Sequence, residues 1–300
     1  MLGEFKNAFQ RHNNAHVQLI IINIVAFVVL AVIRVFTTLT GFEAAFEVFH
    51  NQLAIPAPIH EFLTRPWTMI SYAFVHDLDG ILHILFNMLF LYWFGRLFVE
   101  YLGGDKLVAV YVLGALAGAI LYLLAYNTIP YFVERTRLVE INMVGASAAV
   151  YAIVVAAATL LPDYTFFLLF LGPVRIKYIA AVYIFISFLG SVGSNAGGNI
   201  AHLGGALIGF VYIKQLQAGS NWGGWITATL DWIKSLFKPR SNVKVTYRKN
   251  QKPSADKSSY KASSSVSQEE LDAILDKISE GGYESLTKDE KEKLFNASKK

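Results

Sequence analysis

The sequence predicts an all-α membrane protein, a bundle of six transmembrane helices followed by a cytoplasmic C-terminal tail. Its residues are 54% hydrophobic and 16% charged, whereas an average soluble domain is about 25% charged. Its mean hydropathy is +0.43, and apolar stretches of about the length of a spanning helix recur between residues 17 and 215. The chain has no cysteine, which excludes thiol nucleophiles, thiolate metal sites and disulfides.

Six segments are candidate spans. The first, residues 17–36, has no small-residue cleavage site after its apolar core, so we interpret it as a retained signal-anchor. The other five are residues 80–98, 106–126, 142–161, 176–193 and 197–215. A fourth helix that begins near Ile141 would place Ser147 about 9 Å below its start. The apolar segment 164–173 is too short to span, so we expect it to be interfacial or re-entrant.

Basic residues in the short loops predict the orientation. With six spans, one side of the membrane carries Lys6, Arg11, Arg96, Lys106, Arg175, Lys177, Lys214, Lys234, Lys238 and Arg240. Arg135 and Arg137 lie on the opposite side, beside Glu134 and Glu140. The distribution predicts that both termini are cytoplasmic. We expect an integral multi-pass protein of a bacterial plasma membrane.

Composition divides the chain into five parts. Residues 1–16 form a cytoplasmic N-terminus, residues 17–215 the six-helix membrane domain and residues 216–240 a juxtamembrane segment. Residues 241–266 are basic and Ser-rich, which predicts a disordered linker. Residues 267–300 are predicted to form a two-helix element that docks a cytoplasmic partner or regulates the protein. The basic tail favours anionic lipid, and not nucleic acid, as its electrostatic partner.

Capping signals predict the two helices of the tail. Ser267 with Glu270, and Thr287 with Glu290, have the spacing of a capping box. Apolar residues follow the first signal at helical spacing: Leu271, Ile274, Leu275 and Ile278. Gly281-Gly282 is expected to end the first helix.

Four polar residues lie within the predicted spans. His83 and Asn87 are four residues apart and share one face of the second span. Ser147 opens the fourth span and His202 the sixth. Because these spans all run inward from the extracytoplasmic side, we expect the four residues to lie at a similar depth. Polar groups at that depth are costly and face the protein interior or a water-filled cavity.

Each of these residues alone has a structural interpretation. Ser147 among Ala and Gly would let helices approach closely, and His202 or Asn87 would form an interhelical hydrogen bond. The segments "GALAG" at 114–118 and "GALIG" at 205–209 are predicted packing faces. The coincidence of depth and side favours a shared site instead.

The residue types predict a hydrolytic site. A serine hydroxyl becomes a nucleophile when a base removes its proton, and imidazole is the usual base. His83, Asn87 and the Ser147 backbone N–H could donate hydrogen bonds to an oxyanion. No Asp or Glu lies at this depth, so the pattern predicts a Ser-His dyad. Tyr151, one turn after Ser147, could stack on the imidazole of His202.

The motifs resemble those of the rhomboid family of intramembrane serine proteases. That family has H-x-x-x-N in its second helix, G-x-S-G opening its fourth and A-H-x-x-G opening its sixth; here they read "HILFN", "GASA" and "AHLGG". The resemblance implies that Ser147 is the nucleophile and His202 the general base. It places His83, Asn87 and the Ser147 N–H in the oxyanion hole and Tyr151 against the catalytic histidine.

The resemblance has further implications. Asn199 falls at a polar position of the family and is a candidate supporting residue. Ala148 stands where the motif has Gly, and its methyl group could widen the gap between Ser147 and His202. The expected substrates are single-pass membrane proteins, cut within or beside the membrane near its extracytoplasmic face, in a wet cavity and with no metal or other cofactor.

Two alternatives remain open at this stage. The chain could be a catalytically inactive relative that binds transmembrane clients. It could also be a small transporter that uses the polar cluster as a solute site.

Overall fold

The computed structural model of the chain describes residues 14–168, 172–237 and 268–297. The chain divides into two compact units, Met1–Pro239 and Arg240–Lys300. The predicted linker at 241–266 and the predicted cap Ser267 lie outside the described residues.

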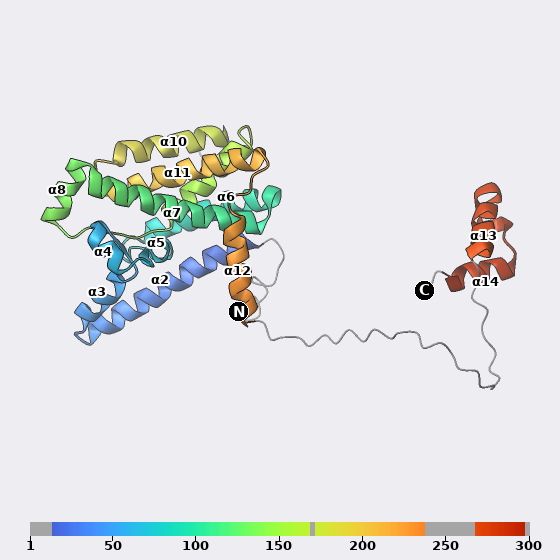
Figure 1. The fold of residues 1–300 in the computed structure, drawn as a ribbon, viewed down its shortest axis with the longest axis horizontal. Coiled ribbons are helices and arrows are strands. Elements are labelled where there is room, and N and C mark those ends of the chain that lie inside the picture. The colour runs from blue at the N-terminus through green and yellow to red at the C-terminus, as the bar shows by residue number, and fades with distance from the viewer. Residues whose placement is uncertain (1–13, 169–171, 238–267, 298–300) are drawn as a thin grey trace. The chain divides into compact units, whose positions relative to one another are not determined.

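Six apolar helices make up most of the first unit (Figure 1). They are α2 (Ala15–Leu39), α6 (Ile81–Leu102), α7 (Gly104–Thr128), α9 (Ser147–Leu160), α10 (Ile176–Gly190) and α11 (Ala196–Gln217). Within the described part of the chain, four helices are long and apolar enough to cross a membrane: α2, α6, α7 and α11. The protein is therefore a multi-pass membrane protein. The other two, α9 and α10, are apolar but shorter, with 14 and 15 residues.

The fourth apolar helix begins later than the sequence predicted. The expectation of a start near Ile141 is wrong, because Asn142–Met143 form an extended strand, β2, and α9 begins at Ser147. Strand β2 pairs antiparallel with β1 (Ile55–Pro56), which holds the backbone extended. Gly145 then turns the chain at φ +134°, a conformation that a side chain disfavours. Ser147 is therefore the first residue of the helix and not a residue in its second turn.

Helix α9 forms the centre of the bundle. Every residue from Ala148 to Ala158 is buried, as expected for a helix enclosed by protein on all sides. The two predicted packing faces provide the close approach. A methyl group added at Gly118 of α7 would come within 2.6 Å of the Ala148 Cβ, and one added at Gly205 of α11 would overlap the Ala148 carbonyl. Because these glycines on α7 and α11 have no side chain, both helices can pack closely against α9.

The connection between the first two long helices folds into short elements. It contains α3 (Glu43–Asn51), β1, α4 (Ile59–Thr64), α5 (Thr68–Ser71) and the 3-10 helix η1 (Tyr72–Phe74). Tyr72 is buried, and its hydroxyl donates to the carbonyl of Ala115 on α7 at 2.7 Å. The pairing of β1 with β2 joins this segment to the strand that leads into Ser147.

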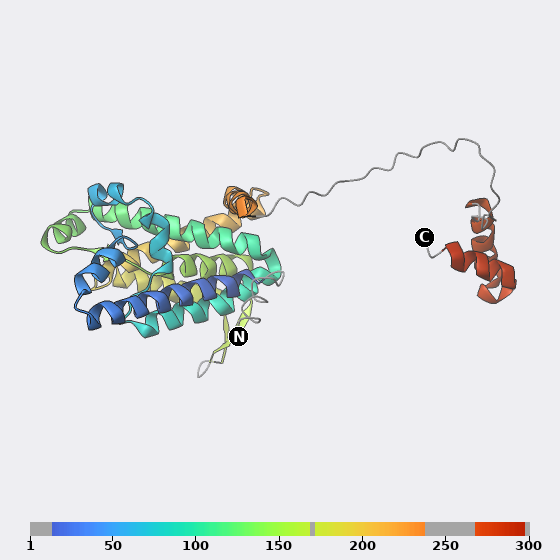
Figure 2. The ribbon, with the colours of Figure 1, turned by 90° about the horizontal axis from the view of Figure 1, so that it is seen from below.

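Three further elements were not predicted from the sequence. Part of the segment 164–173, expected to be interfacial or re-entrant, forms strand β3 (Thr165–Leu168), which pairs antiparallel with β4 (Gly172–Arg175) and projects with it from the bundle (Figure 2), while residues 169–171 lie outside the described residues. Helix α8 (Pro130–Leu138) follows α7, and α12 (Gly224–Phe237) crosses the direction of the long helices (Figure 1). The described part of the chain is mostly helical, with two small two-stranded sheets.

The C-terminal unit contains α13 (Gln268–Gly281), the 3-10 helix η2 (Tyr283–Ser285) and α14 (Lys288–Ala297). As the sequence predicted, α13 ends at the Gly281-Gly282 pair, where Gly282 has a φ of +74°. The capping box of α14 is formed: Glu290 accepts from the Thr287 N–H at 2.7 Å, and the Glu290 N–H donates to the Thr287 hydroxyl at 3.4 Å. Ile274 and Leu286 are buried between the helices.

Candidate active site

The N-terminal ends of three helices meet at Ser147. His83 is in the first turn of α6, Ser147 opens α9, and His202 is in the second turn of α11. The Ser147 hydroxyl lies 2.7 Å from His202 Nε2, at hydrogen-bond distance. The serine and the histidine that the sequence singled out are thus brought together from positions 55 residues apart.

The turn before α9 determines how Ser147 is presented. Gly145 donates its N–H to the carbonyl of Tyr72 at 2.9 Å, which fixes the turn. A Cβ at this position would lie 3.2 Å from His83 Cε1 and 3.5 Å from Ser147 Oγ, so there is little room for a side chain. As a first-turn residue of α9, Ser147 also has a backbone N–H without a partner in the preceding helical turn. The turn therefore presents a hydroxyl and a backbone donor together.

Tyr151 covers the imidazole of His202. The two rings are nearly parallel, with an interplanar angle of 9° and centroids 4.1 Å apart. Tyr151 follows Ser147 by one helical turn, so one face of α9 carries both the hydroxyl and the stacking ring. This stack restricts the rotation of the His202 ring.

The sequence did not single out Ser187. It lies on α10, is fully buried, and its hydroxyl is 3.0 Å from His202 Nδ1 and 2.8 Å from the Tyr151 hydroxyl. The Tyr151 hydroxyl in turn donates to the carbonyl of Tyr183 at 3.3 Å. A lone serine in an apolar span has no sequence signal that separates it from a packing residue. The contact depends on the packing of α10 against α9 and α11.

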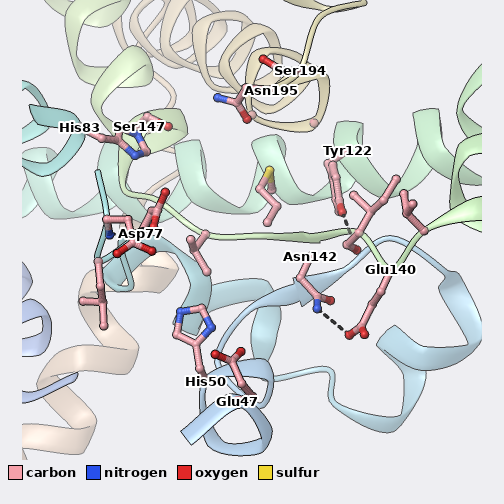
Figure 3. Close-up of a pocket in the computed structure, with 18 of the residues that line it drawn as sticks. Glu47, His50, Asp77, His83, Tyr122, Glu140, Asn142, Ser147, Ser194 and Asn195 are labelled. Carbon is pink, nitrogen blue, oxygen red and sulfur yellow. Dashed lines mark hydrogen bonds between the residues drawn. The ribbon is translucent and has the colours of Figure 1, made fainter. Parts of the chain in front are cut away.

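His83 and Asn87 lie on the side of the site formed by α6. Asn87 is buried, and its Nδ2 has no hydrogen-bond partner among the described residues. An unpaired buried amide is costly, so the Nδ2 of Asn87 can still donate a hydrogen bond. His83 and Ser147 lie next to each other at one end of a cavity (Figure 3).

His76 is a second residue that sequence reasoning missed. It precedes α6, is fully buried, and its ring meets the His83 ring edge-on at a centroid distance of 5.8 Å. Burial, together with the nearby His83, lowers the pKa of His76 to about 4. His76 is therefore neutral at pH 7 and supports His83 by packing, without adding charge.

Asn199 has a different environment from the other candidates. Its amide donates to the carbonyl of Gly190 at 3.0 Å and to that of Asn195 at 2.8 Å. The bond to Gly190 joins the start of α11 to the end of α10, and the bond to Asn195 lies within the start of α11. The structure does not bring Asn199 into hydrogen-bond contact with Ser147 or His202 among the described residues.

A cavity of about 780 Å³ reaches Ser147. Its wall combines His83 and Ser147 with Glu47 and His50 of α3 and with residues 139–144 (Figure 3). Charged side chains from Arg34, Glu47, Asp77, Asp79, Arg135 and Glu140 also line it. The cavity is therefore polar. In the described residues, no group of three or more His, Asp or Glu side chains is arranged to hold a metal ion.

Two family models match the chain. A rhomboid-domain model matches residues 63–217, and a model described as a family of unknown function, DUF6576, matches residues 258–300. The first match includes His83, Asn87, Ser147, Tyr151, Ser187 and His202.

Curated relatives carry rhomboid names. The chain is 31% identical to RHOMBOID-like protein 12, mitochondrial, of Arabidopsis thaliana, over 52% of this chain and 48% of that protein. It is 28% identical to Rhomboid-like protein 16, chloroplastic, of the same plant, over 53% and 52%. It is 27% identical to Rhomboid protein 1, mitochondrial, of Saccharomyces cerevisiae, over 54% and 49%. The chain thus spans about half the length of these relatives. With a rhomboid-domain match over just over half of its 300 residues, the chain belongs to the rhomboid family.

Proposed function

We propose that this protein is an intramembrane serine endopeptidase that uses Ser147 as nucleophile and His202 as general base. The observation that supports this most strongly is the 2.7 Å contact between Ser147 Oγ and His202 Nε2 at the end of a polar cavity. An inactive relative that merely binds clients has no need of this hydrogen bond or of the Tyr151 stack. The geometry therefore favours catalysis over the client-binding alternative.

The proposed reaction begins with transfer of the Ser147 proton to His202 Nε2. The Oγ atom attacks the scissile carbonyl carbon at the same time, and the carbonyl oxygen becomes an oxyanion. His83, Asn87 and the Ser147 N–H donate hydrogen bonds to that oxygen. The unpaired Nδ2 of Asn87 supports this role. The proton on Nε2 then passes to the leaving amine, and water hydrolyses the acyl-enzyme.

The proposed substrates are single-pass membrane proteins. A peptide bond within a helix is shielded by its own backbone, so the substrate must unwind before Ser147 can attack it. Small residues at the cleavage point and helix-weakening residues beyond it would make unwinding easier. The polar cavity is large enough to hold water for deacylation. No metal or organic cofactor is needed for these steps.

The proposed topology has six crossings, with both termini in the cytoplasm of a bacterium and the cavity open to the extracytoplasmic side. At about 1.5 Å per residue, α9 is about 21 Å long, which is less than the roughly 30 Å of a hydrocarbon core. Because α9 is enclosed by protein, its length need not match the lipid. The distribution of Lys and Arg supports the orientation.

The test compares wild-type protein with Ser147→Ala and His202→Ala after reconstitution with a model single-pass substrate. We expect wild type to cut the substrate, both variants to be inactive, and a serine-reactive phosphonate to label only proteins that keep Ser147. Cleavage by Ser147→Ala, or an intact substrate with folded wild type, would overturn the proposal. A transporter would instead move a solute across the vesicle membrane, and the phosphonate would not label Ser147.

A further inference from the structure

Ser187 is the only side chain, among the described residues, with a hydrogen bond to the second ring nitrogen of His202. Its hydroxyl lies 3.0 Å from His202 Nδ1, and its residue is fully buried. No carboxylate among the described residues forms a hydrogen bond or an ion pair with His202. Ser187 thus occupies the position relative to the imidazole that an acidic residue has in a Ser-His-Asp triad.

Only one assignment of hydrogen-bond donors and acceptors in this cluster lets His202 Nε2 accept from Ser147. His202 can remove a proton from Ser147 only if Nε2 carries none, so the neutral ring must carry its hydrogen on Nδ1. Nδ1–H then donates to the Ser187 oxygen. The Ser187 hydroxyl donates to the Tyr151 oxygen at 2.8 Å.

The chain of donors ends on the backbone. The Tyr151 hydroxyl donates to the carbonyl of Tyr183 at 3.3 Å, so the hydroxyls of Ser187 and Tyr151 each have both an acceptor and a donor. In the opposite tautomer, Nδ1 would be an acceptor, so the Ser187 hydroxyl would have to donate its one hydrogen to Nδ1 and not to Tyr151. Nε2 would carry a hydrogen and could not accept from Ser147. Side-chain hydrogen bonds of this kind determine which tautomer a histidine adopts.

We infer that Ser187 is a positioning residue that holds His202 in the Nδ1–H tautomer and in the ring orientation that catalysis requires. The inference rests on the proposed function. During attack, the Ser147 proton moves to Nε2 while Nδ1–H stays in its bond to Ser187, and the Nε2 proton later leaves with the amine. Ser187 neither gains nor loses a proton.

A hydroxyl suits this position better than a carboxylate. Ser187 is surrounded by apolar helix, where an ionised side chain would be expensive to bury. A hydroxyl can accept from Nδ1–H and pass its own proton to Tyr151 without any net charge. The stack of Tyr151 and the hydrogen bond of Ser187 therefore fix the ring from its face and from its edge.

The test is a matched pair at one position. Ser187→Thr keeps the hydroxyl, and Ser187→Val introduces a side chain of nearly the same shape as threonine but without the hydroxyl. We expect the Thr variant to stay within about 3-fold of wild-type kcat and the Val variant to lose about 10- to 100-fold, with KM unchanged in both. That loss is the range expected for one hydrogen bond in a dry site. Ser187→Ala gives the same comparison if the branched side chains do not fit.

Ser191→Ala is the matched control. Ser191 caps the C-terminus of α10, one turn after Ser187, and its hydroxyl donates to the Ser187 carbonyl at 2.8 Å and forms no hydrogen bond with His202. We expect its kcat to equal that of wild type. Equal kcat values for Ser187→Thr and Ser187→Val, or a loss that appears only in KM, would overturn the inference. The proposed function would survive that result, because Ser147→Ala would still be inactive.

A spectroscopic readout is independent of cleavage. The ¹⁵N spectrum of histidine-labelled protein, assigned with His202→Ala, reports which ring nitrogen carries the hydrogen. We expect the Nδ1–H form of His202 in wild type and Ser187→Thr, and a mixture of tautomers in Ser187→Val. An unchanged tautomer in Ser187→Val would contradict the inference even if the protein cut no substrate.

Discussion

Ala148 packs directly against Gly118, so closely that a methyl group added to Gly118 would come within 2.6 Å of the Ala148 Cβ. The sequence raised the concern that the methyl group of Ala148, where the motif has Gly, would widen the gap between Ser147 and His202. The structure shows why it need not do so: the methyl group meets the glycine of α7, while the Ala148 carbonyl approaches Gly205 of α11. The distance between Ser147 Oγ and His202 Nε2 stays at 2.7 Å.

The contact between α7 and α9 predicts a coupled pair of substitutions. Gly118→Ala should lower the free energy of unfolding by about 1–3 kcal/mol, because overpacking forces the helices apart. Adding Ala148→Gly should restore part of this loss. The recovery is partial because a methyl at Gly118 would also meet the Ala201 carbonyl and the Tyr72 hydroxyl. Denaturation in detergent measures the cycle, with Gly224→Ala as control, since a Cβ at Gly224 would make only ordinary van der Waals contact with the Asn221 side chain, at 3.6 Å. Additive effects of the two substitutions would contradict this packing.

Asn87 predicts a defect in rate and not in binding. Asn87→Ala should lower kcat by about 10²–10³-fold with little change in KM, because it removes one donor to the developing oxyanion. Initial rates on the model substrate measure this. Asn23→Ala is the control, since Asn23 is also a buried amide but is bonded to Tyr111 and to the Leu19 carbonyl. It should reduce stability and leave kcat unchanged. A loss confined to KM in Asn87→Ala would argue against its role in the oxyanion hole.

Glu290 predicts how the C-terminal unit responds to acid. Hydrogen bonds from Thr287, with help from Lys277, lower the pKa of Glu290 from 4.5 to about 2. Since its folded pKa lies below its unfolded pKa, Glu290 stabilises the fold above about pH 4.5, and this contribution is lost as pH falls towards 2. The protection of the α14 amides against exchange, relative to the intrinsic rate at each pH, should therefore fall across that window in the full chain. Glu290→Gln should remove this dependence, whereas Glu292→Gln should keep it.

The tail predicts a separable function. A chain that ends at residue 240 should fold and should cut the model substrate at the wild-type rate, because α13 and α14 belong to a separate compact unit. The proposed role of the tail is to dock a cytoplasmic partner or to regulate the protease in the cell. The rate at which the truncated chain cuts the model substrate, in vesicles that contain no other protein, tests whether the tail is needed for cleavage. A folded but inactive truncated chain would place the tail in the catalytic mechanism.

Three residues that the sequence singled out, Ser147, His202 and Tyr151, lie together in the structure, whereas several of the short elements around them were not predicted. Apolar length and periodicity located all six apolar helices, because burial or lipid contact imposes these patterns directly. The predicted start of α9 was wrong because the true start depends on the pairing of Met143 with Ile55, a contact between segments far apart in the chain. The hairpin of β3 and β4 was missed for a related reason, since its short apolar strands have no period that distinguishes them from an interfacial segment.

The candidate residues divide in the same way. Ser147 and His202 were singled out because helices of fixed direction place them at a similar depth, and Tyr151 because it lies one turn after Ser147 on the same helix face. Ser187 was not singled out, because its contact with His202 depends on the rotation of α10 about its own axis. No spacing within one segment encodes that rotation. Contacts that link two helices side by side are therefore the part of the site that a single sequence reveals least.

The enclosure of α9 has a consequence for how the bilayer acts on the protein. A change in bilayer thickness strains helices with lipid-facing sides, such as α2, which exposes Val28, Val32 and Phe36. Helix α9 has no lipid-facing side from Ala148 to Ala158, so a change in bilayer thickness can strain it only through the helices that surround it. We therefore expect the length of the lipid chains to change how readily a proposed substrate enters, while the contact between Ser147 and His202 stays constant.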